Sequence, residues 1–175
     1  GPGRLRCGRI PARKGAAVTT PQSHPTHLGI RSVAWQGLTW VDVEHPSLAG
    51  MSHLQDLYGF HPLALEDCLS RVQLPKVDEY EDHLLIVTHF PVFNRQLRIA
   101  QPSQVSIFAG SSYVVTVHCG DLRPMTKLYR DALGSKSVRA DIMSRSAGYL
   151  LYRILDVLVD DGFPILNKII GNIDS

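Results

Sequence analysis

Five carboxylates in this sequence are spaced so that they could act together on a metal ion. Glu66 and Asp67 are adjacent, Asp156 and Asp160 are four residues apart, and Asp161 comes directly after them. Residues four apart lie on the same stripe of a helix, so the second pair should project together. Mg²⁺ takes oxygen ligands, keeps several waters and usually accepts only one or two carboxylates. The spacing therefore fits weak, water-mediated Mg²⁺ binding, although acidic pairs on helices are usually just solvated surface.

The helix that carries Glu66 and Asp67 is delimited by prolines. Pro62 suits the first turn of a helix, where its missing N–H needs no partner. The helix should end before Pro75, because the residue before a proline is pushed out of the α region. Lys76 then opens an acidic segment that we interpret as a polar turn, and an apolar strand follows it.

The last helix carries the second acidic group. We predict it from about Arg139 to the C-terminus, with a kink or a restart at Pro164. Apolar residues recur on it every three or four positions, which gives it one apolar face. The members of this face before the proline are Leu151, Ile154, Leu155 and Leu158. The sequence holds no run of about 18 apolar residues, so we expect no membrane span within it.

The rest of the chain contains both strand and helix patterns, so we expect an α/β domain. A helix over 47–58 has Ser47 as its N-cap and stops at Gly59. Further strands are predicted at 33–35, 38–43, 83–93, 97–108 and 113–118, and a further helix at 121–133. We expect the aromatic residues of the strands to lie in the core, namely Trp35, Trp40, Phe90, Phe93 and Phe108.

The charges of the chain are unevenly distributed. The net charge is +2, but residues 1–31 carry six bases and no acid, whereas the remainder carries 12 bases and 16 acids. Residues 1–31 also lack apolar periodicity and are rich in Gly, Pro, Ser and Thr, which predicts a disordered basic arm that begins with a tag remnant. We place one folded, mildly acidic domain at 32–175, a length that allows a sizeable core.

The cysteines do not point to a disulfide framework. The three of them have no C-x-x-C spacing, so we expect free thiols in a reducing compartment. A zinc site could draw on Cys68, Cys119, His118 and His61. Such a site would lack the paired, closely spaced ligands that are usual for zinc, and buried thiols are the better expectation.

An enzyme and a nucleic-acid-binding protein are two other classes that we weighed. A metal-assisted hydrolase could use His61, Asp67 and His118, but the sequence has no metalloprotease, nucleophile-elbow or P-loop pattern. Arg71 and Lys76 give too little basic surface for a nucleic-acid site. We therefore expect neither an enzyme nor a nucleic-acid partner.

Several segments resemble, in the right order, the cytoplasmic domain of the CorA family of magnesium channels. The longest match is FHPLALED at 60–67, followed by PKV at 75–77 and YE at 80–81. Shorter matches are the strands WVDV at 40–43, QVSIF at 104–108 and VVTVH at 114–118, and the helix LLYRILDVLVDD at 150–161. The resemblance covers about residues 32–175, and several ordered segments are far more specific than one short motif.

The resemblance implies a fold and a role for the chain. A CorA-like domain has a mixed central β-sheet sandwiched between helices, and its final helix leads toward a stalk and two transmembrane helices beyond Ser175. The chain would then be the cytoplasmic regulatory domain of an inner-membrane channel for Mg²⁺ or Co²⁺. A zinc-transporting relative of the same fold is the alternative. The implied partner is a homo-oligomer, with a pentamer for the full-length protein and a monomer or dimer for the fragment.

The resemblance also implies where regulatory Mg²⁺ would bind. The aspartate of the LED segment corresponds to Asp67, with Glu66 beside it, and would face acidic residues of a neighbouring subunit. The aspartate of the final helix corresponds to Asp156, near a second ion, and Asp160 lies one turn further on. The expected metal ligands are therefore these four carboxylates. Five acidic interfaces would repel one another, and bound Mg²⁺ would hold the closed state until cytoplasmic Mg²⁺ falls.

Overall fold

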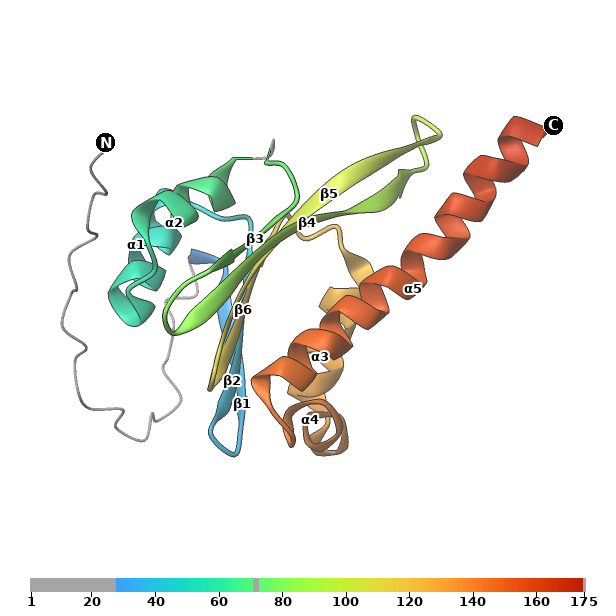
Figure 1. Ribbon diagram of the computed structural model, residues 1–175. Coiled ribbons are helices and arrows are strands. Elements are labelled where there is room, and N and C mark those ends of the chain that lie inside the picture. The colour runs from blue at the N-terminus through green and yellow to red at the C-terminus, as the bar shows by residue number, and fades with distance from the viewer. Residues whose placement is uncertain (1–27, 71–72, 175) are drawn as a thin grey trace, which may run out of the picture.

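The structure, a computed structural model, describes residues 28–70 and 73–174, with side chains up to Gly162 in the last helix. Within these residues no helix is both long enough and apolar enough to cross a membrane. The strands and helices are shown in Figure 1, and their bounds are β1 Ile30–Trp35, β2 Leu38–Glu44, α1 Leu48–Tyr58, α2 Pro62–Leu69, β3 Lys76–Glu79, β4 His83–Asn94, β5 Ile99–Gly110, β6 Tyr113–His118, α3 Arg123–Gly134, α4 Lys136–Met143 and α5 Ala147–Asp174.

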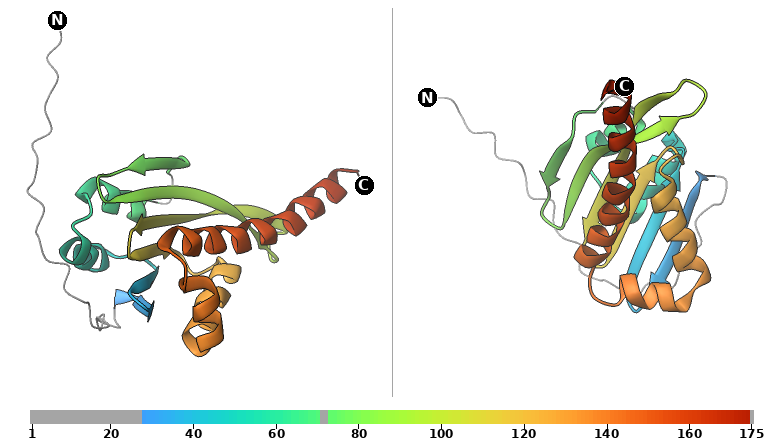
Figure 2. Two further views of the ribbon diagram at one scale, coloured as in Figure 1. Left: turned by 60° about the horizontal axis from the view of Figure 1, so that its bottom comes forward. Right: turned by 90° about the vertical axis from the view of Figure 1, so that its right-hand side faces the viewer.

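The strands of the described residues form one mixed sheet, in the order β1-β2-β6-β5-β4-β3. β2 and β6 run parallel, and every other neighbouring pair is antiparallel. The helices α1 and α2 cover one face of the sheet, and α3, α4 and α5 cover the other (Figures 1 and 2). This three-layer arrangement confirms the predicted α/β fold with a mixed central sheet between helices.

Successive side chains of a strand point to opposite faces of the sheet, so the domain has two cores. On the side of α1 and α2, Phe60 stacks on Phe108 with ring centroids 4.0 Å apart. On the side of α3 to α5, Trp40 and Tyr129 meet edge to face at 5.1 Å. Trp40 and Phe108 are fully buried, as predicted, whereas the other three predicted core aromatics are only partly buried. Each fully buried large apolar side chain stabilises the fold by about 1.5–3 kcal/mol.

The helix α1 has the predicted cap and end, and α2 begins at Pro62 as predicted and ends at Leu69, before Pro75. The Ser47 hydroxyl accepts a hydrogen bond from the amide of Gly50 at 3.0 Å, and so satisfies a free N–H of the first turn of α1. Gly59 ends the helix at φ 69°, in the left-handed region that glycine adopts without strain. His61 Nδ1 accepts from the amide of Leu63 at 3.1 Å, so this imidazole caps α2.

The interpretation of residues 76–79 as a turn is wrong, because they form the edge strand β3. Each of the four pairs with β4, and Val77 lies opposite Ile86. An edge strand exposes one row of backbone groups, and charged side chains there hinder pairing with other chains. The acids that suggested a turn therefore fit a short strand at the edge of a sheet.

The prediction of one last helix from about Arg139 is also wrong. That stretch is divided into α4 and α5, with a break between Met143 and Ala147. The Ser146 hydroxyl accepts from the amide of Tyr149 at 3.0 Å, which caps the new helix. The backbone of α5 stays helical through Pro164, so the helix does not restart there.

Two smaller differences concern where elements begin. β1 starts at Ile30, because its register with β2 continues that far, so Ile30 and Arg31 belong to the sheet although we assigned them to the arm. The remainder of the predicted arm, residues 1–27, lies outside the described residues. α3 starts at Arg123 rather than at Asp121, since the Asp121 carboxylate accepts from the Ser103 hydroxyl at 2.5 Å instead of capping the helix.

Candidate functional site

Asp67, the first predicted metal ligand, is paired with a cation of its own chain. It lies in the last turn of α2, and Lys76, the first residue of β3, donates to its Oδ2 at 2.7 Å. The same ammonium lies 3.1 Å from Oδ2 of Asp78. The side chains of Asp67, Lys76 and Asp78 are 27%, 34% and 41% exposed. Hydrogen bonds to Asp67 and then Asp78 raise the pKa of Lys76, so the ammonium keeps its charge.

Gln104 on β5 holds the end of α2 in place. Its Nε2 donates to the carbonyl of Ser70 at 3.0 Å and more weakly to that of Asp67 at 3.4 Å. Its Oε1 accepts from the amide of Gln73 at 3.3 Å. The last carbonyls of a helix have no partner within the helix, so these bonds satisfy groups that would otherwise stay unpaired. The Asp67 turn is therefore fixed to the sheet by the Gln104 side chain, independently of Lys76.

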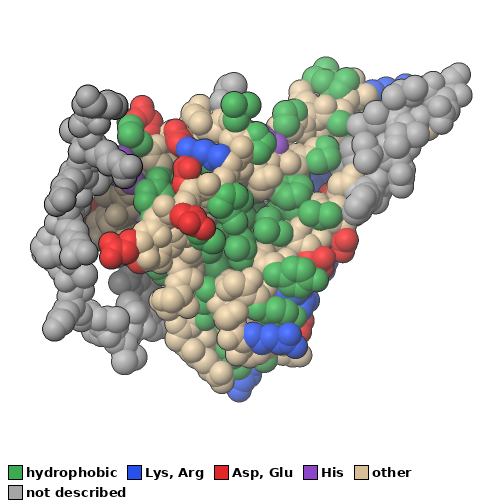
Figure 3. Space-filling view, in the orientation of Figure 1, with side chains coloured by type: hydrophobic (Ala, Val, Ile, Leu, Met, Phe, Trp, Pro, Cys, Tyr) green, Lys and Arg blue, Asp and Glu red, His purple; other side chains and the backbone are tan. Residues whose placement is uncertain are grey.

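Acidic side chains gather around the Asp67 pair. Residues 66–82 contain six acids and two bases. We call the acids of this stretch the acidic rim: Glu66, Asp67, Asp78, Glu79, Glu81 and Asp82. All are exposed except Asp67 and Asp78, which are partly exposed. Figure 3 shows acidic side chains over this end of the molecule, near α2 and β3.

The predicted ligands of α5 lie elsewhere. Asp156 is partly exposed, and Asp160 and Asp161 are exposed. Because α2 and α5 cover opposite faces of the sheet, one chain does not bring Asp67 and Asp156 together (Figures 1 and 2). The predicted ligands therefore form two separate acidic surfaces, one at each face.

A buried polar network that the sequence analysis missed surrounds Asp42 on β2. The Asp42 carboxylate is fully buried. Its Oδ1 accepts from the Thr116 hydroxyl at 2.6 Å and from His118 Nε2 at 2.7 Å. Its Oδ2 accepts from Arg31 at 2.9 and 3.1 Å, and the same guanidinium binds Glu44 at 2.9 Å. Burial raises the pKa of Asp42, but the bonds from His118, Thr116 and Arg31 outweigh it and leave that pKa below its usual value.

The network also fixes the orientation of the His118 ring. Its Nδ1 accepts from the amide of Gly120 at 3.0 Å, so the ring proton is on Nε2 and points to Asp42. Gly120 has φ 86°, a conformation that favours glycine. Both nitrogens of His118 are therefore used in hydrogen bonds. Trp40 Nε1 completes the network by donating to the Thr116 hydroxyl at 3.0 Å.

The same cluster has ligand atoms close enough together for a metal site. Among the described residues, Asp42, Glu44 and His118 are the one group of three whose ligand atoms lie within 4.8 Å of one another. A metal ion there would have to displace Arg31 from both carboxylates and His118 from Asp42. Since every member is already hydrogen-bonded, we assign the cluster to the pairing of β1, β2 and β6. The signal in the sequence was the polar residues within apolar strands, LTWVDVE and YVVTVH.

The described residues do not assemble the two alternative sites. His61 caps α2, Asp67 binds Lys76 and His118 binds Asp42, so the three groups of the hydrolase hypothesis are in separate contacts. Burial raises the pKa of Cys68 to about 12, which keeps the thiol protonated and a poor zinc ligand. Cys68, His118 and Cys119 line one cavity of about 150 Å³, but His61 is not part of its wall.

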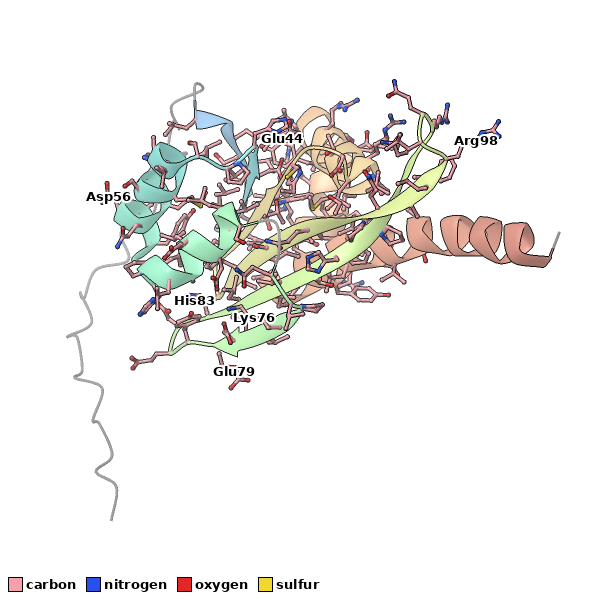
Figure 4. All side chains as sticks on the ribbon, turned by 90° about the horizontal axis from the view of Figure 1, so that it is seen from above. Glu44, Asp56, Lys76, Glu79, His83 and Arg98 are labelled. Carbon is pink, nitrogen blue, oxygen red and sulfur yellow. The ribbon has the colours of Figure 1, made fainter. Side chains whose placement is uncertain are left out.

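The two polar groups thus occupy different parts of the sheet. Figure 4 shows Lys76 and Glu79 on the edge strand β3 and Glu44 toward the other edge. The Asp42 group is a network whose carboxylate is buried and hydrogen-bonded within the chain. The acidic rim is exposed and has excess negative charge. A divalent cation can reach the rim without breaking the core, so the rim is the candidate functional site.

Comparisons with known proteins agree with this fold. A family model described as CorA-like Mg²⁺ transporter protein matches residues 35–175. The putative metal ion transporter YfjQ of Bacillus subtilis is 34% identical over 137 residues, which are 78% of this chain and 40% of YfjQ. The cobalt/magnesium transport protein CorA of Thermotoga maritima is 29% identical over 146 residues, which are 78% of this chain and 38% of that protein. The chain thus spans about two fifths of the length of these relatives.

Solved structures show the same fold. The soluble domain of CorA from Methanocaldococcus jannaschii has a TM-score of 0.66 at 23% identity, over 78% of this chain and 53% of that one. The cytoplasmic domain of ZntB from Vibrio parahaemolyticus has a TM-score of 0.60 at 13% identity, over 79% of this chain and 54% of that one. Identities this low support the fold alone, whereas the family match extends over most of the chain. The chain belongs to the CorA family of metal ion transporters.

Proposed function

We propose that the chain is the cytoplasmic regulatory domain of a Mg²⁺ transporter and that Mg²⁺ acts on it at the acidic rim. The observation that carries this proposal is an excess of exposed acid at the end of α2 and along β3, in a chain of this family. The whole transporter would be an inner-membrane homo-oligomer, with a pentamer as the expected assembly. A second cation position would lie on α5, at Asp156 and Asp160.

The mechanism is electrostatic. Rims from neighbouring copies repel one another, and two unit charges 4 Å apart in water already cost about 1 kcal/mol. Mg²⁺ between the copies replaces this repulsion with attraction and can do so through its bound waters. The ion shifts the transporter toward its closed state only to the extent that it binds that state better. As cytoplasmic Mg²⁺ falls, the interfaces loosen and transport starts.

The ligand types favour Mg²⁺ over zinc. The exposed groups at the rim and on α5 are carboxylates, which suit hard cations such as Mg²⁺, whereas zinc prefers imidazole and thiolate. Two of the groups near the rim that zinc could use are engaged elsewhere, since His61 caps α2 and burial raises the pKa of the Cys68 thiol. The zinc alternative is supported by the likeness to ZntB, which is a likeness of fold.

The test is transport by the intact protein in liposomes while Mg²⁺ is varied on the side of this domain. Asp67→Asn should raise the Mg²⁺ concentration that half-inhibits transport severalfold, because one carboxylate of the interface is lost. Asp131→Asn is the matched control, since Asp131 is a surface carboxylate that binds a lysine at 2.8 Å on α3. The proposal fails if Asp67→Asn and Asp131→Asn both keep the wild-type inhibition curve.

A further inference from the structure

We infer that the Lys76 ammonium competes with a divalent cation for Asp67. It thereby raises the Mg²⁺ concentration that is needed for the ion to bind at the rim. This inference rests on the proposed function, because it concerns the regulation of the same site. It adds a role for a cation of the chain itself, where the proposed function names only carboxylates.

The geometry places the Lys76 ammonium where it shields Asp67. Its nitrogen lies 2.7 Å from Oδ2 of Asp67 and 3.1 Å from Oδ2 of Asp78, so it bridges the end of α2 and the edge strand β3. A carboxylate oxygen at this distance from an ammonium accepts a short, charge-assisted hydrogen bond. The shorter bond goes to Asp67, which is the less exposed of the two acids.

Mg²⁺ and the Lys76 ammonium cannot both bind Oδ2 of Asp67 without weakening each other's interaction. Mg²⁺ holds its oxygen ligands at about 2.0–2.1 Å, and a second cation on that oxygen would be repelled. A water-bridged Mg²⁺ would still meet the same positive charge nearby. Binding of the ion to Asp67 therefore requires Lys76 to leave or to remain on Asp78 alone.

Lys76 is able to leave. Its side chain is 34% exposed, and lysine is a flexible, strongly hydrated cation that loses little when it returns to water. The α2 turn does not depend on it, because Gln104 holds the carbonyl of Ser70 and the amide of Gln73. Arg31 is similarly exposed, at 36%, but it makes two bonds to a fully buried carboxylate and is therefore harder to displace.

The expected effect is modest, because surface ion pairs are weak. Removing the competitor should tighten Mg²⁺ binding by a factor of about 1.4 to 5 at low salt, the range that corresponds to measured exposed pairs. High salt screens the pair and should shrink the difference between the variants. Lys76 thus sets the threshold of the response without being a ligand.

The experiment is a Mg²⁺ titration of the whole chain, followed by NMR of the Lys76 ammonium and of the backbone amides near Asp67. The variants are Lys76→Gln, which removes the cation, Lys76→Arg, which keeps it, and Asp67→Asn. Lys127→Gln is the matched control, because Lys127 binds Asp131 at 2.8 Å away from the rim. Urea unfolding of each variant checks that the fold is kept.

The inference predicts tighter binding in Lys76→Gln, wild-type binding in Lys76→Arg and Lys127→Gln, and release of the ammonium as Mg²⁺ is added. Binding in Lys76→Gln that equals or falls below the wild type, while Asp67→Asn loses binding, overturns the inference and leaves the proposed function standing. Equal binding by Asp67→Asn and the wild type overturns the inference, and so does a failure of the wild type and Lys76→Gln to bind at all. The transport assay on the intact protein decides the proposed function separately.

Discussion

Two groups of carboxylates in this chain each hold a cation of the chain itself, and they differ in burial. Asp42 is fully buried and binds Arg31, Thr116 and His118. Asp67 is 27% exposed and binds Lys76, with further acids around it. The buried group has all its partners, whereas the exposed rim keeps an excess of negative charge that solvent and ions can reach.

The comparison shows that the cluster with the most closely spaced ligand atoms is not necessarily the metal site of a chain. Asp42, Glu44 and His118 have three ligand atoms close together, yet a mobile ion there would have to break several buried hydrogen bonds. The rim has a looser geometry but a replaceable cation. A regulatory ion that must come and go at cellular concentrations fits the second situation.

The largest effect is expected from Asp42→Asn. The substitution removes the charge of a buried carboxylate that accepts hydrogen bonds from Arg31, Thr116 and His118, so stability should fall by about 2–3 kcal/mol. Asp67→Asn should cost less than about 1 kcal/mol, because its pair is partly exposed. Urea unfolding of both variants measures the contrast. Equal losses would mean that the two groups do not differ as described.

Thr116→Val should have an intermediate effect. The valine keeps the shape of the side chain but removes the hydroxyl that joins Trp40 Nε1 to Asp42. Both partners would stay buried with one bond fewer, which should cost about 1–3 kcal/mol. The measurement is urea unfolding followed by tryptophan fluorescence, with Thr88→Val, on a partly exposed position of β4, as the control. A loss no larger than that of the control would contradict the network.

The dependence of the free energy of unfolding on pH should also reveal the contribution of Asp42. The pKa of Asp42 is lowered in the folded state, so its contribution is complete above its unfolded pKa of about 3.9 and is lost as pH falls through the folded value. The wild type should therefore lose stability in acid, below about pH 4, and Asp42→Asn should lose less over that interval. Parallel acid curves for the two proteins would be inconsistent with this account.

The smallest effect is expected at Lys76. A double-mutant cycle of Lys76→Gln and Asp67→Asn should give a coupling of about 0.2–1 kcal/mol that vanishes in high salt. The pKa of Lys76 is raised, so any contribution of its charge is present at neutral pH and is lost only as pH rises through the folded value. A coupling that persists in high salt would mean that Lys76 is part of the core structure and not a replaceable cation.

Much of the fold was predictable because its signals are local. The Ser47 cap, the Gly59 stop and the Pro62 start each act within one turn, and all three appear as expected. The strand β3 was missed because its residues are charged, and its strand character comes from pairing with β4. The break before Ala147 was missed because a short serine-containing segment does not interrupt the apolar periodicity around it.

The candidate site was predictable only in part. The position of Asp67 on a helix followed from the sequence, but its place in the last turn of α2 and its pairing with Lys76 did not, because the pairing depends on the fold that brings β3 beside α2. The Asp42 network joins residues 74 and 76 positions apart, so no local pattern could link them. Polar residues at alternating positions in apolar strands were the sign that such a network would form.

The most direct test of where divalent cations act is line broadening by Mn²⁺, used in place of Mg²⁺, in backbone NMR spectra of the chain. The account predicts that amide signals around Glu66, Asp67 and Asp78 broaden at low Mn²⁺, together with those of the acidic part of α5. The signals of Asp42 and His118 should stay sharp in the same samples. Broadening that begins at Asp42 and His118 while the rim stays sharp would contradict it.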